Sequence, residues 1–482
     1  MPKLSQKNAV FLVLILIVAF GFFLRAYHFS DWLHFELDQA RDARVIDAAL
    51  SGGPGELTLL GPKAGGTFLR LAPGFYYLQY VSGIIFGGTP SGIAMVVLIL
   101  SVLSIPLFYF LSRRFFSEWI SLGLTLLFAA SPFMVMYGRF AWNPNLIPFF
   151  TLLGFYALLR AVDGAEKRKN LWFLVAAFGI TAATHFHFLA FLALPTITVL
   201  FLALRRPKIA WQAWVGAVCI VFVLYLPMVL NDIETNGANV KEFFGAIGEK
   251  STKEDHTLLE KGIRDVSEHA LASIVVTTGF EGATFPSFSF DDKRPVPWFC
   301  DASCDKGKWY GTAGLLGLIL GVFSLGFLTW KEKERRKSDF LFLIILWFGV
   351  TFVLYMPLAY GIAPRFFLVS APIFFLFLGF LLTLIVKWIK GVKSKKGVIL
   401  LLIGIFALSN LFFLFGRFDE LRRAGTEQVE SAPDRILKER VRVTLEQQKA
   451  VVAFLKKRTE EANAPVYMFS EPQYRRALKY LL

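Results

Sequence analysis

Residues 9–26 read AVFLVLILIVAFGFFLRA, an apolar run with one charged side chain near its end. Residues 92–111 and 364–386 form similar runs, each close to the roughly 20 residues that a helix needs to cross a ~30 Å hydrocarbon layer. Backbone polar groups in lipid must be paired within their own segment, so each run is predicted to be an α-helix. The runs therefore indicate an all-α polytopic membrane protein.

The composition supports the same fold class. The 482 residues are 55% hydrophobic and 18% charged, and they include 52 Phe, whereas soluble domains carry about 25% charged residues. The net charge of +15 is concentrated in short stretches between apolar runs. Lys and Arg in short loops mark the cytoplasmic side of a membrane protein, so this charge indicates orientation and not a nucleic-acid partner. The basic clusters occupy residues 113–114, 166–169, 205–208, 331–337 and 387–396.

One orientation places all these clusters and the N-terminus on the cytoplasmic side. It requires about eleven transmembrane helices. Residues 73–86 are assigned to an in-plane helix in the membrane interface, because counting them as a span would place most of the later basic loops on the outer side. No small-residue cleavage site follows the first run, so that run is expected to remain as a span. The expected spans are residues 9–27, 92–111, 118–137, 145–161, 170–184, 186–204, 210–230, 311–330, 339–358, 364–386 and 397–416.

The same orientation defines the domains. Residues 1–417 form the predicted transmembrane domain, with a first outer loop at 28–91 and a large outer loop at 231–310. Residues 418–482 are predicted to be a small C-terminal extracytoplasmic region. The protein is therefore expected to be integral to the plasma (cytoplasmic) membrane, with its polar loops and C-terminus outside.

The large outer loop holds Cys300 and Cys304. These two residues could form a disulfide or remain as two thiols, because their spacing alone decides nothing. No compact acidic cluster in the sequence predicts a metal site, so none is assigned, and a divalent cation is left open as a cofactor.

The first outer loop contains the most informative stretch, FELDQARDAR at residues 35–44. Asp38 lies just after the first span and just before a predicted helix that ends at a Gly-Gly-Pro turn. A carboxylate close to apolar helices can act as a base. Alternatively, Asp38 could cap the following helix while Arg41 and Asp42 form a solvated face.

Over its first half the chain resembles the GT-C superfamily of membrane glycosyltransferases, in particular the protein O-mannosyltransferases and the aminoarabinose (lipid A) transferases. These enzymes carry an Asp-Glu pair early in the first outer loop, followed by an in-plane helix with a Pro and paired aromatic residues. Here Asp38-Gln39 stands at the acidic pair, and Tyr76-Tyr77 follow Pro73. Gln39 replaces the second acid of the pattern, so a mechanism with two carboxylates at this pair is not expected.

The resemblance implies a glycosyltransferase that moves a sugar, with inversion, from a polyprenyl-phosphate-linked donor to an acceptor protein, lipid or glycan at the outer face. Asp38 would be the general base, a role worth about 10²–10⁴-fold in rate. Cations would hold the charge that develops on the leaving phosphate. The candidates for that role are Arg365, Arg139, Arg70 and Lys63. The candidate substrate-binding residues are Gln39, Arg41, Asp42, Tyr76, Tyr77, Trp142, Asn143, His185, His187 and Asp232.

Several of these residues have a structural alternative. Arg365 could extend to lipid headgroups, and Trp142 with its Asn-Pro turn could anchor the chain at the membrane interface. His185 and His187 would point to different faces of a helix, and either could be a packed histidine.

Two other function classes are alternatives. A lipid or polysaccharide translocator without covalent chemistry would carry polar residues along its spans, and the spans show few. The near absence of ionisable residues inside the spans also argues against an ion-coupled transporter. A membrane scaffold would instead bind a partner through residues 418–482.

Overall fold

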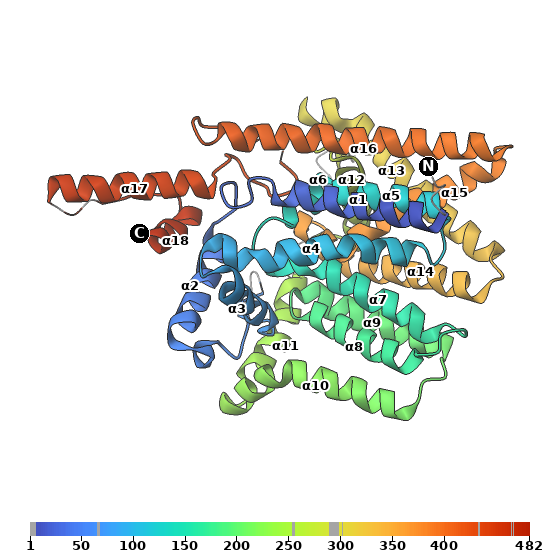
Figure 1. Ribbon diagram of the computed structural model, residues 1–482, viewed down its shortest axis with the longest axis horizontal. Helices are drawn as coiled ribbons and strands as arrows, with labels where there is room; N and C mark the ends of the chain where they lie inside the picture. Colours follow the sequence, from blue (N-terminus) through green and yellow to red (C-terminus); the bar gives the residue numbers. More distant parts are fainter. Residues whose placement is uncertain are drawn as a thin grey trace.

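The computed structural model describes residues 6–64, 68–252, 256–288, 298–300, 302–431, 434–463, 465 and 467–482. Long helices lie side by side in a bundle (Figure 1). They are α1 (Gln6–Ala26), α4 (Pro90–Ser112), α5 (Glu118–Ala130), α7 (Ile147–Val162), α8 (Lys169–Thr184), α9 (Phe188–Arg205), α10 (Trp211–Glu234), α13 (Ala302–Lys331), α14 (Arg335–Tyr355), α15 (Ala371–Trp388) and α16 (Val392–Arg423). Each expected span contains one of them, which confirms the all-α polytopic fold class.

Nine helices in the described part of the chain are long and apolar enough to cross a membrane. The expected span at 118–137 is interrupted, because α5 ends after 13 residues. Ser131 then takes an extended ψ of 123°, as residues before proline prefer, and α6 (Pro132–Tyr137) begins at Pro132. Hydropathy alone does not reveal this break.

The expected span at 364–386 also begins differently from the prediction. Its first residues form the 3-10 helix η4 (Pro364–Val369), and α15 starts only at Ala371. The buried Trp347 indole of α14 donates to the Val369 carbonyl at 2.9 Å. Arg365 therefore lies in a separate turn that is fixed to α14, outside the membrane-crossing helix.

The first loop, residues 28–91, folds at one end of the bundle. Its helices are α2 (Leu37–Gly52), η1 (Pro54–Glu56) and α3 (Gly74–Phe86). Glu36 is the N-cap of α2, and Gln39 Oε1 accepts from the Glu36 N–H at 3.1 Å. With 13 residues, α3 is too short to cross a bilayer, and its position in the membrane interface stays a prediction.

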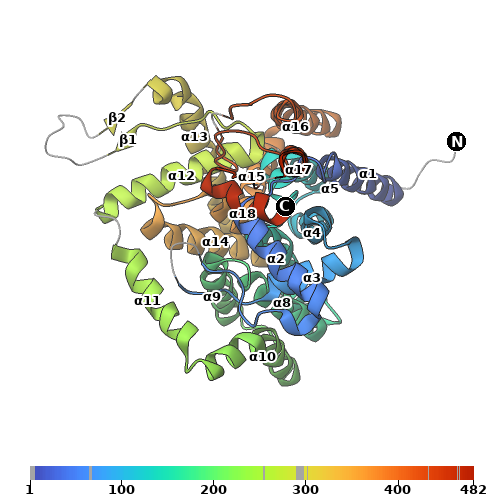
Figure 2. The same cartoon turned by 90° about the vertical axis from the view of Figure 1, so that its left-hand side faces the viewer.

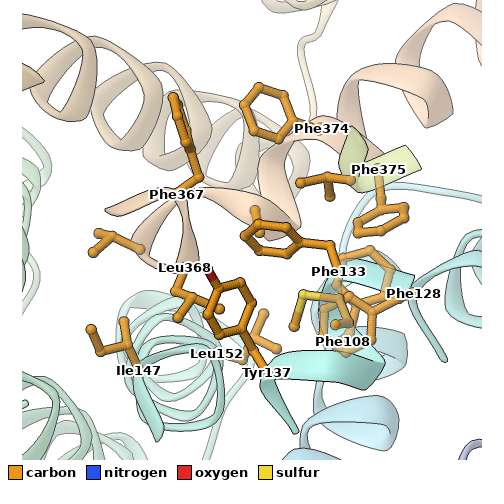
Figure 3. Packing of buried hydrophobic residues seen from close by; sticks show 14 of the residues in the cluster. Phe108, Phe128, Phe133, Tyr137, Ile147, Leu152, Phe367, Leu368, Phe374 and Phe375 are labelled. Carbon is orange, nitrogen blue, oxygen red and sulfur yellow. The ribbon is translucent and has the colours of Figure 1, made fainter. Parts of the chain in front are cut away.

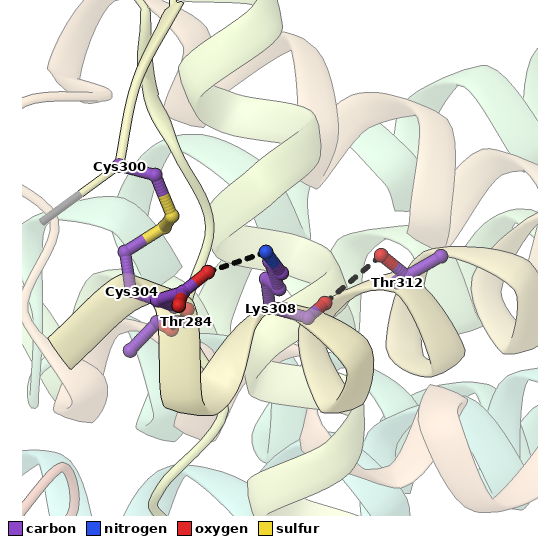
Figure 4. The surroundings of a disulfide bond; sticks show 6 residues. Thr284, Cys300, Cys304, Lys308 and Thr312 are labelled. Carbon is purple, nitrogen blue, oxygen red and sulfur yellow. Dashed lines mark hydrogen bonds and ion pairs between the residues drawn. A yellow bond between two sulfur atoms is a disulfide. The ribbon is translucent and has the colours of Figure 1, made fainter. Parts of the chain in front are cut away.

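The 231–310 loop contains two helices, a short hairpin and a disulfide. The elements are α11 (Ala238–Thr252), α12 (Leu258–Thr278) and the antiparallel strands β1 (Ser287–Phe288) and β2 (Trp298–Phe299). Cys300 and Cys304 are joined by a disulfide, with Cα atoms 5.2 Å apart (Figure 4). The Thr284 hydroxyl donates to the Cys304 carbonyl at 3.1 Å. The question that spacing left open is thus answered in favour of the disulfide.

The C-terminal region lies at the same end as the first loop (Figures 1 and 2). It contains α17 (Leu445–Ala462) and α18 (Pro472–Leu481), and α18 packs against α2. The Tyr480 and Phe35 rings lie 5.7 Å apart, and Gln448 Nε2 donates to the Phe35 carbonyl at 2.9 Å. The tail therefore covers the start of α2. That it lies outside the membrane stays a prediction.

The hydrophobic core runs between the long helices and ends under the first loop. Aromatic residues dominate it, with Phe108 of α4 stacked on Phe128 of α5 at 4.7 Å. Tyr137 of α6 and Phe367 of η4 belong to the same cluster (Figure 3). Two other short elements complete this end, η2 (Asn143–Leu146) and η3 (Met356–Leu358). These short elements, together with the starts of α2 and α9, carry the candidate site.

Candidate active site

A cavity of about 260 Å³ opens beside the N-terminus of α2. Its walls come from the first loop, the turn before α7, the start of α9 and the segment 358–366. The residues that line it are Asp38, Arg41, Lys63, Ala64, Leu71, Trp142, Asn143, Pro144, His187, Phe188, Leu189, Leu358, Arg365 and Phe366. Seven of these residues were candidates from the sequence. Segments that are far apart in the chain therefore meet at one cavity, as expected from the placement of the polar loops on one side of the membrane.

Asp38 occupies the first turn of α2 and is partly exposed to the cavity. Its Oδ1 accepts from Arg41 Nη1 at 2.9 Å, and its Oδ2 accepts from Trp142 Nε1 at 3.2 Å. Because Glu36 is the N-cap, the Asp38 carboxylate is not used to cap the helix. Two donors therefore fix the carboxylate in place while part of its surface stays accessible.

Arg41 connects Asp38 to a second, buried carboxylate. Arg41 Nε donates to Asp42 Oδ1 at 2.8 Å, and the Asp42 side chain is fully buried. Burial raises the pKa of Asp42 to about 7, against the opposing effect of Arg41. Tyr76 of α3 is also buried, and burial together with Asp42 raises its pKa. Asp42 thus lies behind the cavity wall and holds Arg41 from its buried side.

Arg365 lines the same cavity as Asp38. Its guanidinium carbon lies 5.0 Å from the centre of the Trp142 ring and 5.3 Å from that of Phe366. In the described part of the chain the Arg365 guanidinium makes no hydrogen bond or ion pair. The Trp142 side chain therefore contacts both charged groups, with its N–H on Asp38 and its ring face on Arg365. An arginine held by ring faces alone keeps its donors available for an anion.

Three further sequence candidates line the cavity. Asn143 Nδ2 donates to the Phe186 carbonyl at 2.6 Å. His187 is the N-cap of α9, where its Nδ1 accepts from the Leu189 N–H at 3.2 Å. Lys63 is exposed, and its ammonium lies 4.8 Å from the Phe68 ring. Lys63 is thus a second cation at this cavity, whereas Asn143 and His187 use polar atoms to shape its wall.

Among the sequence candidates that lie outside this cavity, Arg139 and His185 are buried. Arg139 is 3% exposed, and its guanidinium donates to the carbonyls of Leu24, Arg25 and Tyr27 at 3.0, 2.9 and 2.6 Å. It therefore caps the end of α1. His185 is buried against Tyr225, with ring centres 4.7 Å apart, and burial lowers its pKa to about 4.

Arg70 and Asp232 line a neighbouring cavity of about 250 Å³, which shares Leu71 and Phe188 with the first one. Arg70 Nε donates to the Gly61 carbonyl at 3.0 Å. Asp232 Oδ1 accepts from the Asn239 N–H at 2.9 Å and so caps α11. The remaining walls of this second cavity are mainly apolar, with the rings of Phe191, Phe243 and Phe244.

The last two candidates are held by backbone contacts. Gln39 is buried and belongs to the capping box of α2. The Tyr77 hydroxyl donates to the Thr58 carbonyl at 3.4 Å. Neither side chain lines the Asp38 cavity.

Sequence reasoning missed two features of this end of the molecule. The apolar wall of the cavity, including Phe188, Leu358 and Phe366, carries no local signal that separates it from ordinary membrane packing. His34, Glu36 and Glu439 also lie close enough to offer atoms to one ion. His34 Nδ1 is 2.6 Å from Glu439 Oε1. Although burial opposes charging of His34, the two carboxylates raise its pKa to about 9, so the ring itself supplies the positive charge.

Residues 71–230 match the family model of dolichyl-phosphate-mannose-protein mannosyltransferases. This segment carries Trp142, Asn143 and His187 of the cavity, whereas Asp38 and Arg365 lie outside it. No curated protein sequence matches the chain significantly.

Two solved structures share the fold. The oligosaccharyltransferase AglB from Archaeoglobus fulgidus, in complex with an inhibitory peptide and a dolichol-phosphate, aligns over 99% of this chain and 64% of that chain, with a TM-score of 0.54 and 13% identity. ArnT from Cupriavidus metallidurans bound to undecaprenyl phosphate aligns over 94% of this chain and 73% of that chain, with a TM-score of 0.55 and 12% identity. The chain thus spans less than two thirds of the length of AglB.

These likenesses show that the chain shares the fold of AglB and ArnT. The match of residues 71–230 and the shared fold agree with the resemblance to protein mannosyltransferases and aminoarabinose transferases that was drawn from the sequence.

Proposed function

We propose that the protein is an inverting glycosyltransferase that uses a polyprenyl-phosphate-linked sugar and acts at the outer face of the membrane. The observation that carries this proposal is one cavity lined by a fixed carboxylate, Asp38, and by a guanidinium, Arg365, that has no ion pair among the described residues, with Trp142 in contact with both. A base and an anion-binding cation in one cavity are the two groups that sugar transfer from a phosphate requires.

In the proposed reaction Asp38, Arg365 and Lys63 each have a role. The acceptor oxygen attacks the anomeric carbon on the face opposite the phosphate, and its proton passes to Asp38. The bond between that carbon and the phosphate oxygen breaks, and its electron pair leaves with the polyprenyl phosphate. Arg365, with Lys63 at the rim, holds the extra negative charge. Attack from the opposite face inverts the anomeric configuration.

The neighbouring apolar cavity suits the lipid part of such a donor. It adjoins the Asp38 cavity through Leu71 and Phe188, and its aromatic wall would bury the first isoprene units. AglB and ArnT were both solved with polyprenyl phosphates, which supports the same donor class here. The proposed acceptor is a protein, a lipid or a glycan.

A divalent cation is not assigned a step. The described lining residues of the cavity offer one carboxylate, and its two oxygens already accept from Arg41 and Trp142. Such a set falls short of the several oxygen ligands that Mg²⁺ or Ca²⁺ takes. Arg365 and Lys63 supply the positive charge in the proposed reaction instead.

The proposal is tested by the release of undecaprenyl phosphate from a panel of undecaprenyl-phosphate-linked hexoses and pentoses, with a membrane extract as acceptor. Asp38→Asn should lower turnover by about 10²–10⁴-fold. Asp31→Asn is the matched control, because Asp31 is an exposed acid of the same loop that pairs with His28. Full turnover in Asp38→Asn would contradict the role of Asp38 as the general base. Movement of labelled lipid across liposomes without any covalent product would favour the translocator.

A further inference from the structure

A separate polar cavity of about 180 Å³ lies on the other side of η4 from the Asp38 cavity. Arg365 and Phe366 line the Asp38 cavity, whereas their neighbours Pro364 and Phe367 line this one. Its other walls are α12 and residues 434–438 of the C-terminal region. One turn of 3-10 helix therefore separates the two cavities.

The charged side chains of this polar cavity are mostly cationic. The cations are Arg264, Arg435 and Lys438, and the anions are Glu268 and Asp434. The charge of Asp434 is already compensated from behind the cavity. Its carboxylate accepts from Arg417 Nη2 at 3.0 Å and from Arg442 Nη1 at 2.6 Å. Neither of these two arginines lines the cavity.

Glu268 forms an ion pair with only one of the three cations, although its charge also favours the cationic form of Arg435. It pairs with Arg264 one turn earlier on α12, with Arg264 Nη2 and Glu268 Oε1 2.6 Å apart. The Arg264 Nε is buried without a hydrogen-bond partner in the described part of the chain. The pair therefore still presents a donor that nothing in the described residues satisfies.

Arg435 and Lys438 form no ion pair with the residues that the structure describes. In the Arg435 side chain only Nε has a partner among them, and it donates to the Glu281 carbonyl at 3.1 Å. Within the described residues its two terminal nitrogens and the ammonium of Lys438 make no hydrogen bond or ion pair. Tyr360 adds an aromatic wall and stacks on His256 at 3.7 Å. Two free cations, an unsatisfied arginine donor and an aromatic face form a site for a compact anion.

We propose that this cavity binds an anionic group, a phosphate or a carboxylate, carried by the acceptor substrate. The proposal rests on the proposed function, because it takes Arg365 on the opposite face of η4 as the site of the donor phosphate. Donor and acceptor would then be held on the two sides of a single rigid turn. Such positioning is how binding distant from the reacting atoms contributes to rate.

The first experiment measures anion binding by the full-length purified protein. Inorganic phosphate is titrated by calorimetry into protein that has been saturated with undecaprenyl phosphate, so that the Arg365 site is filled. The wild type should bind one further phosphate. Arg435→Gln/Lys438→Gln should bind it at least about tenfold more weakly, since charged hydrogen bonds are lost. Lys449→Gln, an exposed cation on α17, should bind phosphate like the wild type.

Three results would overturn the proposal. The first is equal phosphate affinity in the wild type and the double variant, and the second is no phosphate bound at all after saturation with the lipid. The third is a double variant that also loses undecaprenyl phosphate, which would assign the cavity to the donor. Arg435→Lys/Lys438→Arg should restore most of the binding, and an unchanged unfolding temperature would show that the double variant is folded.

The link to the acceptor has its own measurement. Added inorganic phosphate should inhibit the release of undecaprenyl phosphate by the wild type and should inhibit the double variant much less. Equal inhibition of both would contradict an acceptor role for this cavity. The titration needs no turnover, so a failure of the Asp38 test would leave the anion site standing, and a failed titration would leave the Asp38 test intact.

Discussion

Trp142 is the residue on which the geometry of the proposed site depends, because its indole touches both charged groups. Its N–H donates to Asp38 Oδ2 and its ring lies under Arg365. Trp142→Phe should remove the donor and keep the ring face. We expect turnover to fall by about one to two orders of magnitude, the worth of a hydrogen bond to a charged group, with little change in the KM for the donor. A change in KM with unaltered turnover would show that Trp142 only shapes the donor site.

Arg365 is expected to act mainly on the donor. Arg365→Gln removes a cation that has no other partner in the described residues, so kcat/KM for the undecaprenyl-phosphate sugar should fall by roughly 10²-fold or more. The kcat/KM of Arg365→Lys should lie between those of the wild type and Arg365→Gln, because lysine keeps the charge but not the planar guanidinium. Arg422→Gln is the control, since Arg422 is an exposed arginine that pairs with Asp419. Activity of Arg365→Gln within twofold of this control would contradict the role.

Asp38 and Arg365 were predicted from the sequence as a base and a phosphate-binding cation, and both line the cavity. Arg139 has the same local signature, but its partners are carbonyls at the end of α1. No pattern around Arg139 encodes a contact with residues more than a hundred positions away. The capping role of Gln39 follows from its place three residues after Glu36, which a search for an acidic pair overlooks.

At the scale of elements, the C-terminal region fixes the helix that carries Asp38. His34, just before α2, pairs with Glu439 of the tail, and α18 packs along α2. Hydropathy predicts the long helices well because lipid leaves the backbone no alternative. It does not predict the break at Ser131 or the separate turn η4, because both are set by proline and by tertiary contacts such as Trp347 with Val369.

The His34–Glu439 pair predicts a pH dependence of stability. The folded-state pKa of His34 is raised to about 9, above the ordinary value of about 6.5. The folded state therefore binds the proton more tightly, so the contribution to stability is complete below pH 6.5 and is lost as the pH rises through 9. The unfolding temperature of the wild type should fall relative to that of His34→Gln across this interval. His28→Gln, which alters an exposed ring, should follow the wild type, and a constant wild-type to His34→Gln difference at all pH values would contradict the pairing.

For the whole molecule, the orientation in the membrane stays a prediction from the basic loops. It can be tested with single cysteines in a Cys219→Ser background, because the other two cysteines are joined to each other. Lys479→Cys on α18 should react with an impermeant maleimide added outside intact cells. Lys167→Cys, in the basic loop before α8, should react only after lysis. The reverse pattern would place the Asp38 cavity on the cytoplasmic side.

The contacts between distant segments could not be predicted from the sequence. The placement of the polar loops on one side of the membrane brought Asp38, Trp142 and Arg365 to one end of the molecule, but it could not distinguish the Asp38 cavity from the cavity behind η4. That separation depends on the path of residues 358–367 between α14 and α15, which is fixed by packing against both helices.

The most direct test of the account is an experimental structure of the protein with undecaprenyl phosphate bound. We expect the phosphate within about 3 Å of the Arg365 guanidinium, the normal distance for a charge-assisted hydrogen bond. The first isoprene units should lie against Phe188 and Phe243, and Asp38 should face the phosphate across the cavity. A phosphate bound elsewhere, with Arg365 still resting on Trp142 and free of the ligand, would contradict the central claim.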